Sequence, residues 1–193
     1  IIMNDPEKIV PNNKMDTDLP GYAWDLLPYK SKPLDLYRAP MWHAEYDFEK
    51  RTPYASLQTS LGCQFGCNFC MINILNRNDN EEVGVASNYS GMRFWTTEFI
   101  IKEFDKLIDM GVKTIRIVDE MFLLNPKYYI PLCKELAERN KDDSLRIWSY
   151  SRIDTVKRPE ILELVRKAGI KWLALGIESG AKFIFGSCPR GAG

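Results

Sequence analysis

Tyr54-Ala-Ser-Leu-Gln-Thr-Ser-Leu-Gly-Cys63-Gln-Phe-Gly-Cys67-Asn-Phe-Cys70 is the stretch from which the rest of the sequence can be interpreted. Its first seven residues predict a short strand that ends at Gly62. Three of the five cysteines in the chain follow directly, at C-x3-C-x2-C spacing. Thiolates this close together on one loop can converge on a single metal centre, and they suit iron–sulfur clusters, zinc or Cu(I).

The number of cysteines in this loop favours a catalytic cluster over a structural zinc site. A structural zinc ion needs four protein ligands, and the remaining candidates, His43, Cys133 and Cys188, are isolated in the sequence. Three cysteines on a 4Fe–4S cluster would leave one iron open for a substrate or a cofactor. Zinc binding and three cysteines without a ligand role remain as alternatives.

Downstream of the loop, segments that predict strands alternate with segments that predict helices. A helix that starts at Thr96 or Thr97 and runs to Asp109 has apolar residues at helical spacing and stops before Gly111. The other expected elements are strands at 112–118, 145–150 and 171–177 and helices at about 125–140 and 159–168. This alternation implies parallel strands with right-handed crossovers. We therefore predict an α/β fold, a partial TIM-like (β/α) barrel with about four parallel strands.

Polar residues follow the expected strands at the points where the strands end. In a β/α barrel these positions gather on one face. They are the cysteine loop, Asp119 and Glu120, Arg152 and Asp154, and Glu178 and Ser179. Each of them could equally be a solvated loop residue or a helix cap, and Arg152 could simply pair with Asp154. Together with the cysteines, however, they predict a site at the mouth of the barrel.

The cysteine loop resembles the signature of the radical S-adenosylmethionine (SAM) superfamily, C-x3-C-x-aromatic-C, with Phe69 at the aromatic position. The resemblance implies that Cys63, Cys67 and Cys70 hold a 4Fe–4S cluster whose open iron binds SAM. It also implies an enzyme that reductively cleaves SAM to a 5′-deoxyadenosyl radical for hydrogen abstraction from a substrate. An electron donor such as flavodoxin or ferredoxin would then be a partner, with a small-molecule substrate that the sequence does not identify.

The same resemblance implies roles for residues at the other strand ends. Asp119-Glu120 stands where many members have Gly-Gly-Glu, a variant typical of cobalamin-linked members, and would contact the amino group of SAM. Arg152 would pair with the carboxylate of SAM. Gly176-Ile-Glu-Ser-Gly180 resembles a family segment near the ribose. The residues that we expect to contact SAM are therefore Phe69, beside the adenine, and Asp119, Glu120, Arg152, Glu178 and Ser179.

The domain organisation that we predict has three parts. Residues 1–53 contain seven prolines and read as a linker or wrapping segment, whose stretch 19–28 resembles the connection between a cobalamin-binding domain and the radical SAM core. We expect it to pack against a folded body and to follow such an N-terminal domain. Residues 54–180 form a partial radical SAM core, and residues 181–193 diverge from the family. Cobalamin-assisted methyl transfer is then an expected reaction.

Composition narrows the remaining functions. Lysine plus arginine equals aspartate plus glutamate at 26 each, so net charge gives no argument for a nucleic-acid or membrane partner. The sequence has no apolar run of about 18 residues, its first residues do not resemble a secretory signal, and clustered cysteines indicate a reducing compartment, so we expect a cytoplasmic protein. The alternatives are a non-catalytic iron–sulfur or zinc-binding module and a β/α domain used for protein interaction.

Overall fold

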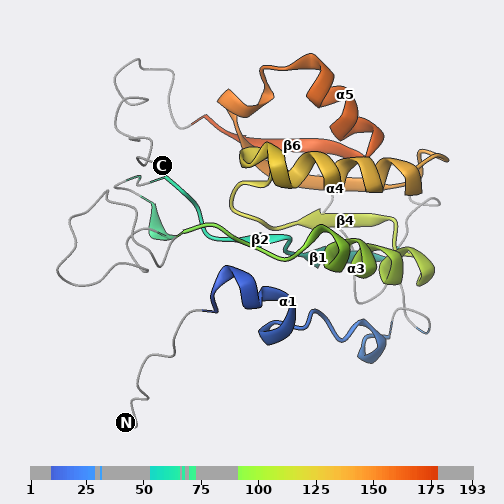
Figure 1. Cartoon of the computed structure of the whole chain (residues 1–193). Coiled ribbons are helices and arrows are strands. Elements are labelled where there is room, and N and C mark those ends of the chain that lie inside the picture. Colours follow the sequence, from blue (N-terminus) through green and yellow to red (C-terminus); the bar gives the residue numbers. More distant parts are fainter. Residues whose placement is uncertain are drawn as a thin grey trace, which may run out of the picture.

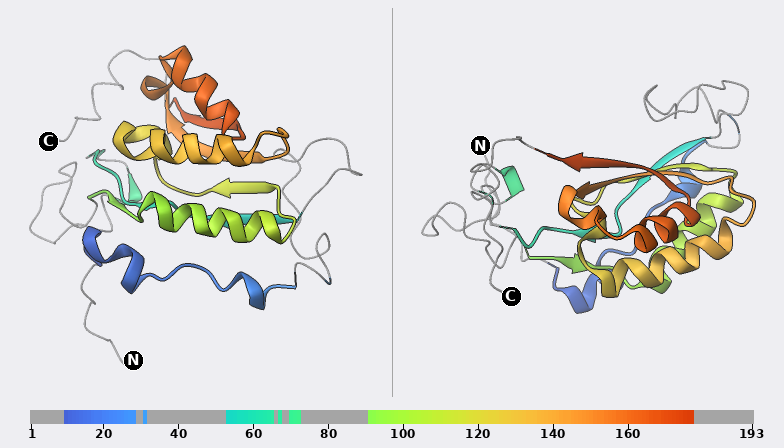
Figure 2. Two further views of the ribbon diagram at one scale, coloured as in Figure 1. Left: turned by 45° about the vertical axis from the view of Figure 1, so that its right-hand side comes forward. Right: turned by 90° about the horizontal axis from the view of Figure 1, so that it is seen from above.

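The fold is built on a four-stranded parallel sheet in the computed structural model, which describes residues 10–28, 31, 53–65, 67, 70–72 and 91–177. The strands are β1 (Tyr54–Leu57), β4 (Thr114–Ile117), β5 (Arg146–Arg152) and β6 (Ile170–Gly176), adjacent in that order and all parallel. Helices α3 (Thr97–Asp109), α4 (Pro126–Arg139) and α5 (Pro159–Lys167) cover one face of this sheet (Figures 1 and 2). The predicted α/β fold with parallel strands is confirmed.

Local sequence signals set the helix boundaries. The hydroxyl of Thr96 caps α3 by accepting a hydrogen bond from the backbone N–H of Phe99 at 3.2 Å. The helix ends where Gly111 adopts a φ of +82°, because this conformation lets Val112 N–H reach the carbonyl of Leu107 at 2.9 Å. Asn125 caps α4 in the same way as Thr96 caps α3, and Pro126 takes its first position.

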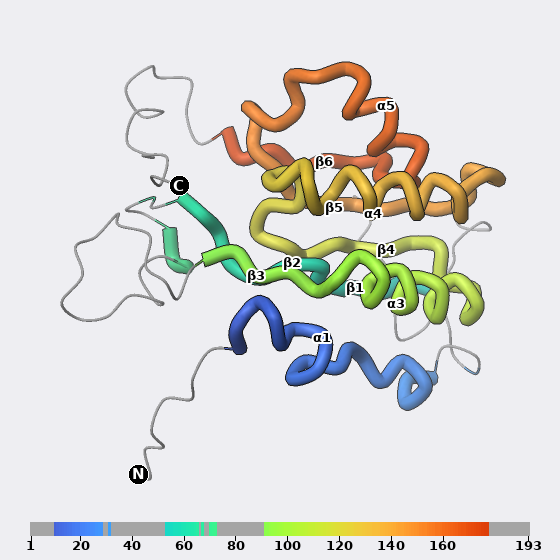
Figure 3. Tube along the Cα trace, viewed as in Figure 1, coloured from blue at the N-terminus to red at the C-terminus, as the bar shows by residue number. Residues whose placement is uncertain are grey.

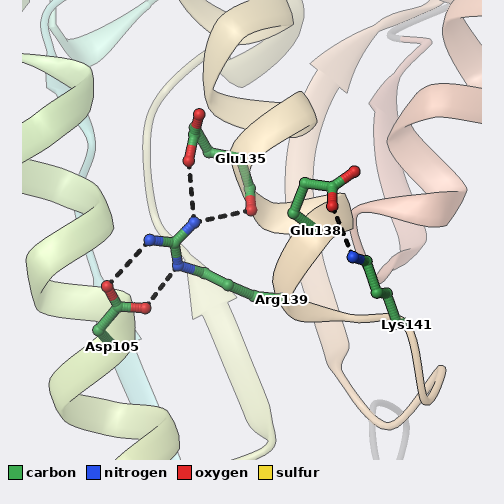
Figure 4. A network of polar contacts seen from close by, with 5 residues as sticks. All are labelled: Asp105, Glu135, Glu138, Arg139 and Lys141. Atoms are coloured by element: carbon green, nitrogen blue, oxygen red, sulfur yellow. Dashed lines mark hydrogen bonds and ion pairs between the residues drawn. The ribbon is translucent and has the colours of Figure 1, made fainter.

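The core lies between the sheet and the three helices. Alternate strand residues point into it, with Leu57, Ile115 and Ile117 at most 1% exposed, and α3 contributes Phe104 and Leu107, which are fully buried. Arg139 of α4 joins the outer sides of two helices, since its Nε lies 2.5 Å from Oδ1 of Asp105 on α3 (Figure 4). The helices are therefore held side by side by packing and by this ion pair.

One predicted strand is shorter than expected. The sequence suggested a strand over residues 54–60, but β1 ends at Leu57. Ser60–Leu61 forms a separate strand, β2, which pairs in antiparallel register with β3 (Arg93–Phe94). The backbone leaves the main sheet here because Thr59 and Ser60 turn inward and bond to Asp119. This short ribbon places the cysteine loop at the carboxyl end of the sheet.

The N-terminal segment, residues 10–28, packs beside α3, as its apolar residues predicted (Figures 1 and 3). Trp24 is 6% exposed, and its indole N–H donates to Oε2 of the buried Glu103 at 2.7 Å. Trp95 donates to the carbonyl of Leu19 at 2.9 Å. The segment contains η1 (Asn12–Lys14), α1 (Met15–Asp18) and η2 (Trp24–Leu26), and the other short helices are η4 (Phe122–Leu124) and η5 (Ile153–Val156).

Among the helices that the structure describes, each is too short or too polar to cross a lipid bilayer.

Candidate functional site

The carboxyl end of the sheet brings together ionisable groups from three strand ends. Cys63 follows β2, Glu120 follows β4, and Arg152 is the last residue of β5. Their charges influence one another: burial raises the pKa of the Cys63 thiol, Cys70 and Glu120 raise it further, and Arg152 and the N–H of Phe65 oppose the rise. Four of the predicted site residues therefore share one electrostatic environment: Cys63, Cys70, Glu120 and Arg152.

The cysteines have the chemistry that an iron–sulfur cluster requires. Cys63 is 8% exposed, and both Cys63 and Cys70 carry free thiols. Among the described residues, no three cysteine, histidine, aspartate or glutamate side chains converge closely enough to hold a metal ion. Three cysteine thiols are nevertheless the donor set that a 4Fe–4S cluster with one open iron takes.

Glu120 has one carboxylate oxygen available inside the site. Oε2 is buried and has no hydrogen-bond partner among the described residues, while the backbone of Gly62 lies close enough to the carboxyl to lower its pKa. Burial raises the pKa of this carboxyl, and the guanidinium of Arg93 partly offsets the rise. A buried acceptor without a donor is costly, and an ammonium group would satisfy it. The position next to Cys63 thus fits the amino group of SAM.

Arg152 lies over the cysteine loop. Its guanidinium carbon is 4.1 Å from the ring centroid of the buried Phe65, and its Nε donates to Asp154 at 3.0 Å. The Arg152–Asp154 pair, which the sequence offered as the alternative to a cofactor role for Arg152, is therefore present. A contact between Arg152 and the carboxylate of SAM stays a prediction.

Asp119, next to Glu120, is fully buried and bonded within the protein. Its Oδ1 accepts from the backbone N–H of Thr59 at 2.6 Å, and Oδ2 accepts from the hydroxyls of Thr59 and Ser60 at 2.5 and 2.7 Å. Burial raises its pKa to about 6, although these hydrogen bonds lower it. A contact between the side chain of Asp119 and SAM stays a prediction. Both carboxylate oxygens already have hydrogen-bond donors from the protein, which argues against such a contact.

Three of the predicted cofactor-binding residues, Phe69, Glu178 and Ser179, lie outside the described residues. The structure adds Thr59, Ser60 and Phe65, which the sequence reasoning missed. The signal was present for the first two, because polar residues directly before a cysteine loop, at the end of a buried strand, are unusual unless something bonds them.

A parallel α/β sheet with a cysteine loop, a carboxylate and a guanidinium at its carboxyl end is the arrangement of a β/α protein whose site lies at that end of the strands. The chain belongs to the radical SAM superfamily, whose family model matches residues 57–185. The resemblance seen in the sequence is thereby confirmed, and with it the cofactors of the superfamily, a 4Fe–4S cluster and SAM. Radical SAM enzymes need a reductant.

Individual relatives share this part of the chain. It is 34% identical over 128 residues to hopanoid C-2 methylase from Rhodopseudomonas palustris (strain TIE-1), covering 64% of this chain and 22% of that protein. It is 29% identical over 129 residues to the anaerobic magnesium-protoporphyrin IX monomethyl ester cyclase of Cereibacter sphaeroides, covering 63% and 18%. The chain therefore spans about a fifth of the length of these relatives.

A solved structure supports the fold. The radical SAM methyltransferase TsrM from Kitasatospora setae, with cobalamin and a [4Fe-4S] cluster bound, superimposes with a TM-score of 0.52. The match covers 66% of this chain and 21% of that chain at 19% sequence identity. At this identity the likeness concerns the arrangement of strands and helices alone.

Proposed function

We propose that this chain is the cofactor-binding part of a radical SAM enzyme, in which Cys63, Cys67 and Cys70 hold a 4Fe–4S cluster and Glu120 binds the amino group of SAM. When bound, these cofactors supply a carbon-centred radical able to remove hydrogen from an unactivated substrate carbon. The observation that carries the proposal is the buried Oε2 of Glu120, which has no donor among the described residues, beside the buried thiol of Cys63.

The residues of the chain supply position and shielding. Phe65 and Cys63 are 7% and 8% exposed, so water has little access to that side of the loop, and burial and hydrogen bonding tune the potential of a cluster. Arg152 adds positive charge next to the thiolates, which stabilises their ionised form. A guanidinium is also the side chain best suited to a carboxylate such as that of SAM.

Two reactions are compatible with the relatives, and we favour cobalamin-assisted methyl transfer. Hopanoid C-2 methylase is a methylase, and TsrM is a methyltransferase with cobalamin bound, whereas the magnesium-protoporphyrin relative is a cyclase. The cobalamin would be bound by a domain that precedes residues 1–53 in the whole enzyme. Absorbance of the anaerobically purified full-length protein would reveal retained cobalamin, and transfer of labelled methyl from SAM would distinguish the methyltransferase from a cyclase.

Reduction in the cell would come from flavodoxin or ferredoxin, in the cytoplasm. The support for this location is chemical, since three clustered cysteines must stay reduced to bind iron.

Anaerobic reconstitution tests the cluster assignment. After reduction of the protein with dithiothreitol, wild type should bind about four irons and four sulfides per chain, following the composition of the cubane. Cys63→Ala, Cys67→Ala and Cys70→Ala should each lose most of this iron. Cys133→Ala is the matched control, because Cys133 is buried in α4, away from the loop.

Two outcomes would overturn the assignment. Wild type that stays free of iron and colourless under strict anoxia would exclude the cluster. Equal iron content in the three loop variants and in Cys133→Ala would show that the iron is bound elsewhere. Addition of SAM should change the electron paramagnetic resonance (EPR) spectrum of the reduced cluster, which a non-catalytic iron–sulfur or zinc module does not predict.

A further inference from the structure

A buried hydrogen-bond network ties the end of β4 to the residues that precede the cysteines. Asp119 is the acceptor of this network, and both of its oxygens are used by donors of Thr59 and Ser60, at 2.5–2.7 Å. Hydrogen bonds to an ionised carboxylate are short and strong in this way. All three residues are at most 1% exposed. Water therefore does not compete for these bonds.

Tyr128 forms a further hydrogen bond to Thr59. Its hydroxyl, on α4, donates to the backbone carbonyl of Thr59 at 2.7 Å, and its ring packs against Phe94 of β3 at a centroid distance of 4.5 Å. Thr59 therefore has its N–H, its hydroxyl and its carbonyl all bonded to side chains of other elements. Thr59 is thus fixed at three points, although it lies outside the regular strands.

The network bears on the site because Asp119 precedes Glu120 directly. The carboxyl of Glu120 lies close to the backbone of Gly62, the residue before Cys63, which lowers its pKa. The two residues that follow β4 therefore contact different parts of the segment before the cysteines. Asp119 bonds Thr59 and Ser60 on the buried side, and Glu120 lies near Gly62 on the side of the site. If the bonds to Thr59 and Ser60 were lost, the separation between Glu120 and Cys63 would no longer be fixed.

We infer that Asp119 is a positioning residue. It fixes the position of the cysteine loop relative to the SAM-binding carboxylate of Glu120, and it contacts neither cofactor itself. This inference rests on the proposed function. It assigns Asp119 a role different from that of a cofactor ligand. A carboxylate is required because three donors converge on it, and an amide would offer one acceptor oxygen and an NH2 group that faces a donor.

Asp119→Asn in the reconstituted full-length protein tests this role. The variant should fold and should keep most of its iron, because the three cysteines are intact. Its dissociation constant for SAM should rise about tenfold, which corresponds to about 1.4 kcal/mol, and the SAM-induced change in the EPR spectrum should become weaker and heterogeneous. Asp109→Asn, which alters an exposed residue at the end of α3, is the matched control and should behave as wild type.

The outcomes separate this inference from the proposed function. Wild type that binds neither iron nor SAM refutes both. Wild type with a cluster and SAM bound, together with an Asp119→Asn variant of equal SAM affinity and equal EPR spectrum, refutes the positioning role alone.

Two further variants keep the positioning role testable if Asp119→Asn fails to fold. Thr59→Val and Ser60→Ala each remove one hydroxyl donor while the carboxylate remains, and each should weaken SAM binding by a smaller factor than Asp119→Asn. An unchanged SAM response in both variants would refute the inference. Loss of the fold in all three variants would refute it as well, since the network would then serve the whole core and not the loop.

Discussion

Adjacent residues with the same functional group have different roles in this site. Asp119 and Glu120 both follow β4, and side chains alternate across a strand and its immediate extension. Asp119 faces inward and has both oxygens bonded, whereas Glu120 faces the cysteine loop and keeps one oxygen without a donor among the described residues. The side of the backbone on which each carboxylate lies therefore determines whether its oxygens are bonded within the protein or are available to a ligand.

Glu120→Gln should weaken SAM binding while leaving iron content near that of wild type. The amide has nearly the same shape, but it lacks the negative charge that attracts an ammonium group, so we expect the dissociation constant for SAM to rise tenfold or more. Titration of the reconstituted protein with SAM, followed by EPR, measures the change. Glu160→Gln, at an exposed position of α5, should have no effect, and equal affinity in both variants would contradict the role of Glu120.

Asp119 should make the stability of the iron-free protein depend on pH. Its folded pKa of about 6 lies above the ordinary value of 3.8, so the folded state binds the proton more tightly. The stabilisation from this proton is fully present below pH 3.8 and is lost as the pH rises through 6. The loss amounts to about 3 kcal/mol at about 1.4 kcal/mol per pKa unit.

The measurement is the free energy of unfolding in urea for wild type and Asp119→Asn between pH 4 and pH 7. Because both proteins share all other titrating groups, the difference between them isolates Asp119. Relative to the variant, wild type should become less stable across this range. A constant difference would show that the pKa of Asp119 is not raised.

At the scale of elements, the sequence predicted the helices and three of the four long strands within a few residues. Helix α3 was predictable because its cap, its apolar stripe and its terminal glycine all lie within the helix or beside it. The position at which β1 ends was not predictable in this way. Residues 54–60 have the composition of one continuous strand, and the bonds that divert Thr59 and Ser60 come from Asp119, about 60 residues away.

The junction between α5 and β6 depends on Gly169. Its φ is +91°, and a β-carbon added there would lie 2.6 Å from the β-carbon of Leu145. Gly111 has a similar φ of +82°, but nothing lies within 4 Å of its added β-carbon. We predict that Gly111→Ala costs about 1 kcal/mol from backbone strain and that Gly169→Ala costs at least about 1 kcal/mol more from overpacking.

Urea denaturation of the two variants measures this difference directly. A cost for Gly169→Ala no larger than that for Gly111→Ala would mean that β6 can move away from Leu145 without loss.

At the scale of the whole molecule, buried contacts join the N-terminal segment to the rest of the described chain. Trp24 and Glu103 are 79 residues apart in the sequence, and Glu103, only 2% exposed, also pairs with Lys106 at 2.6 Å. Trp24→Phe keeps an aromatic ring but removes the donor to Oε2 of Glu103. Leaving a buried carboxylate oxygen without its donor should cost about 1–3 kcal/mol.

Thermal and urea unfolding of Trp24→Phe test this contribution. Leu26→Ala, in the same segment but 78% exposed, is the control and should change stability by less than about 0.5 kcal/mol. Equal stability of the two variants would indicate that the segment is only loosely attached.

The candidate site was predictable where its chemistry is local. The cysteine spacing needs only eight residues, and the strand ends follow from the alternation of helices and strands. The different surroundings of Asp119 and Glu120 could not be predicted, because they depend on which side of β4 meets Thr59 and Gly62. The contact of Arg152 with Phe65 likewise arises only when the loop folds back over β5.

Arg93 connects the start of the described chain to this site. Its guanidinium donates to the carbonyl of Val10 at 3.2 Å and attracts Glu120, whose carboxylate in turn influences Cys63. Loss of the contact with Val10 would alter how Arg93 is held, and the balance of charge at Glu120 and Cys63 would change with it. Part of the tuning of the cysteine thiol is thus delegated to the N-terminal segment.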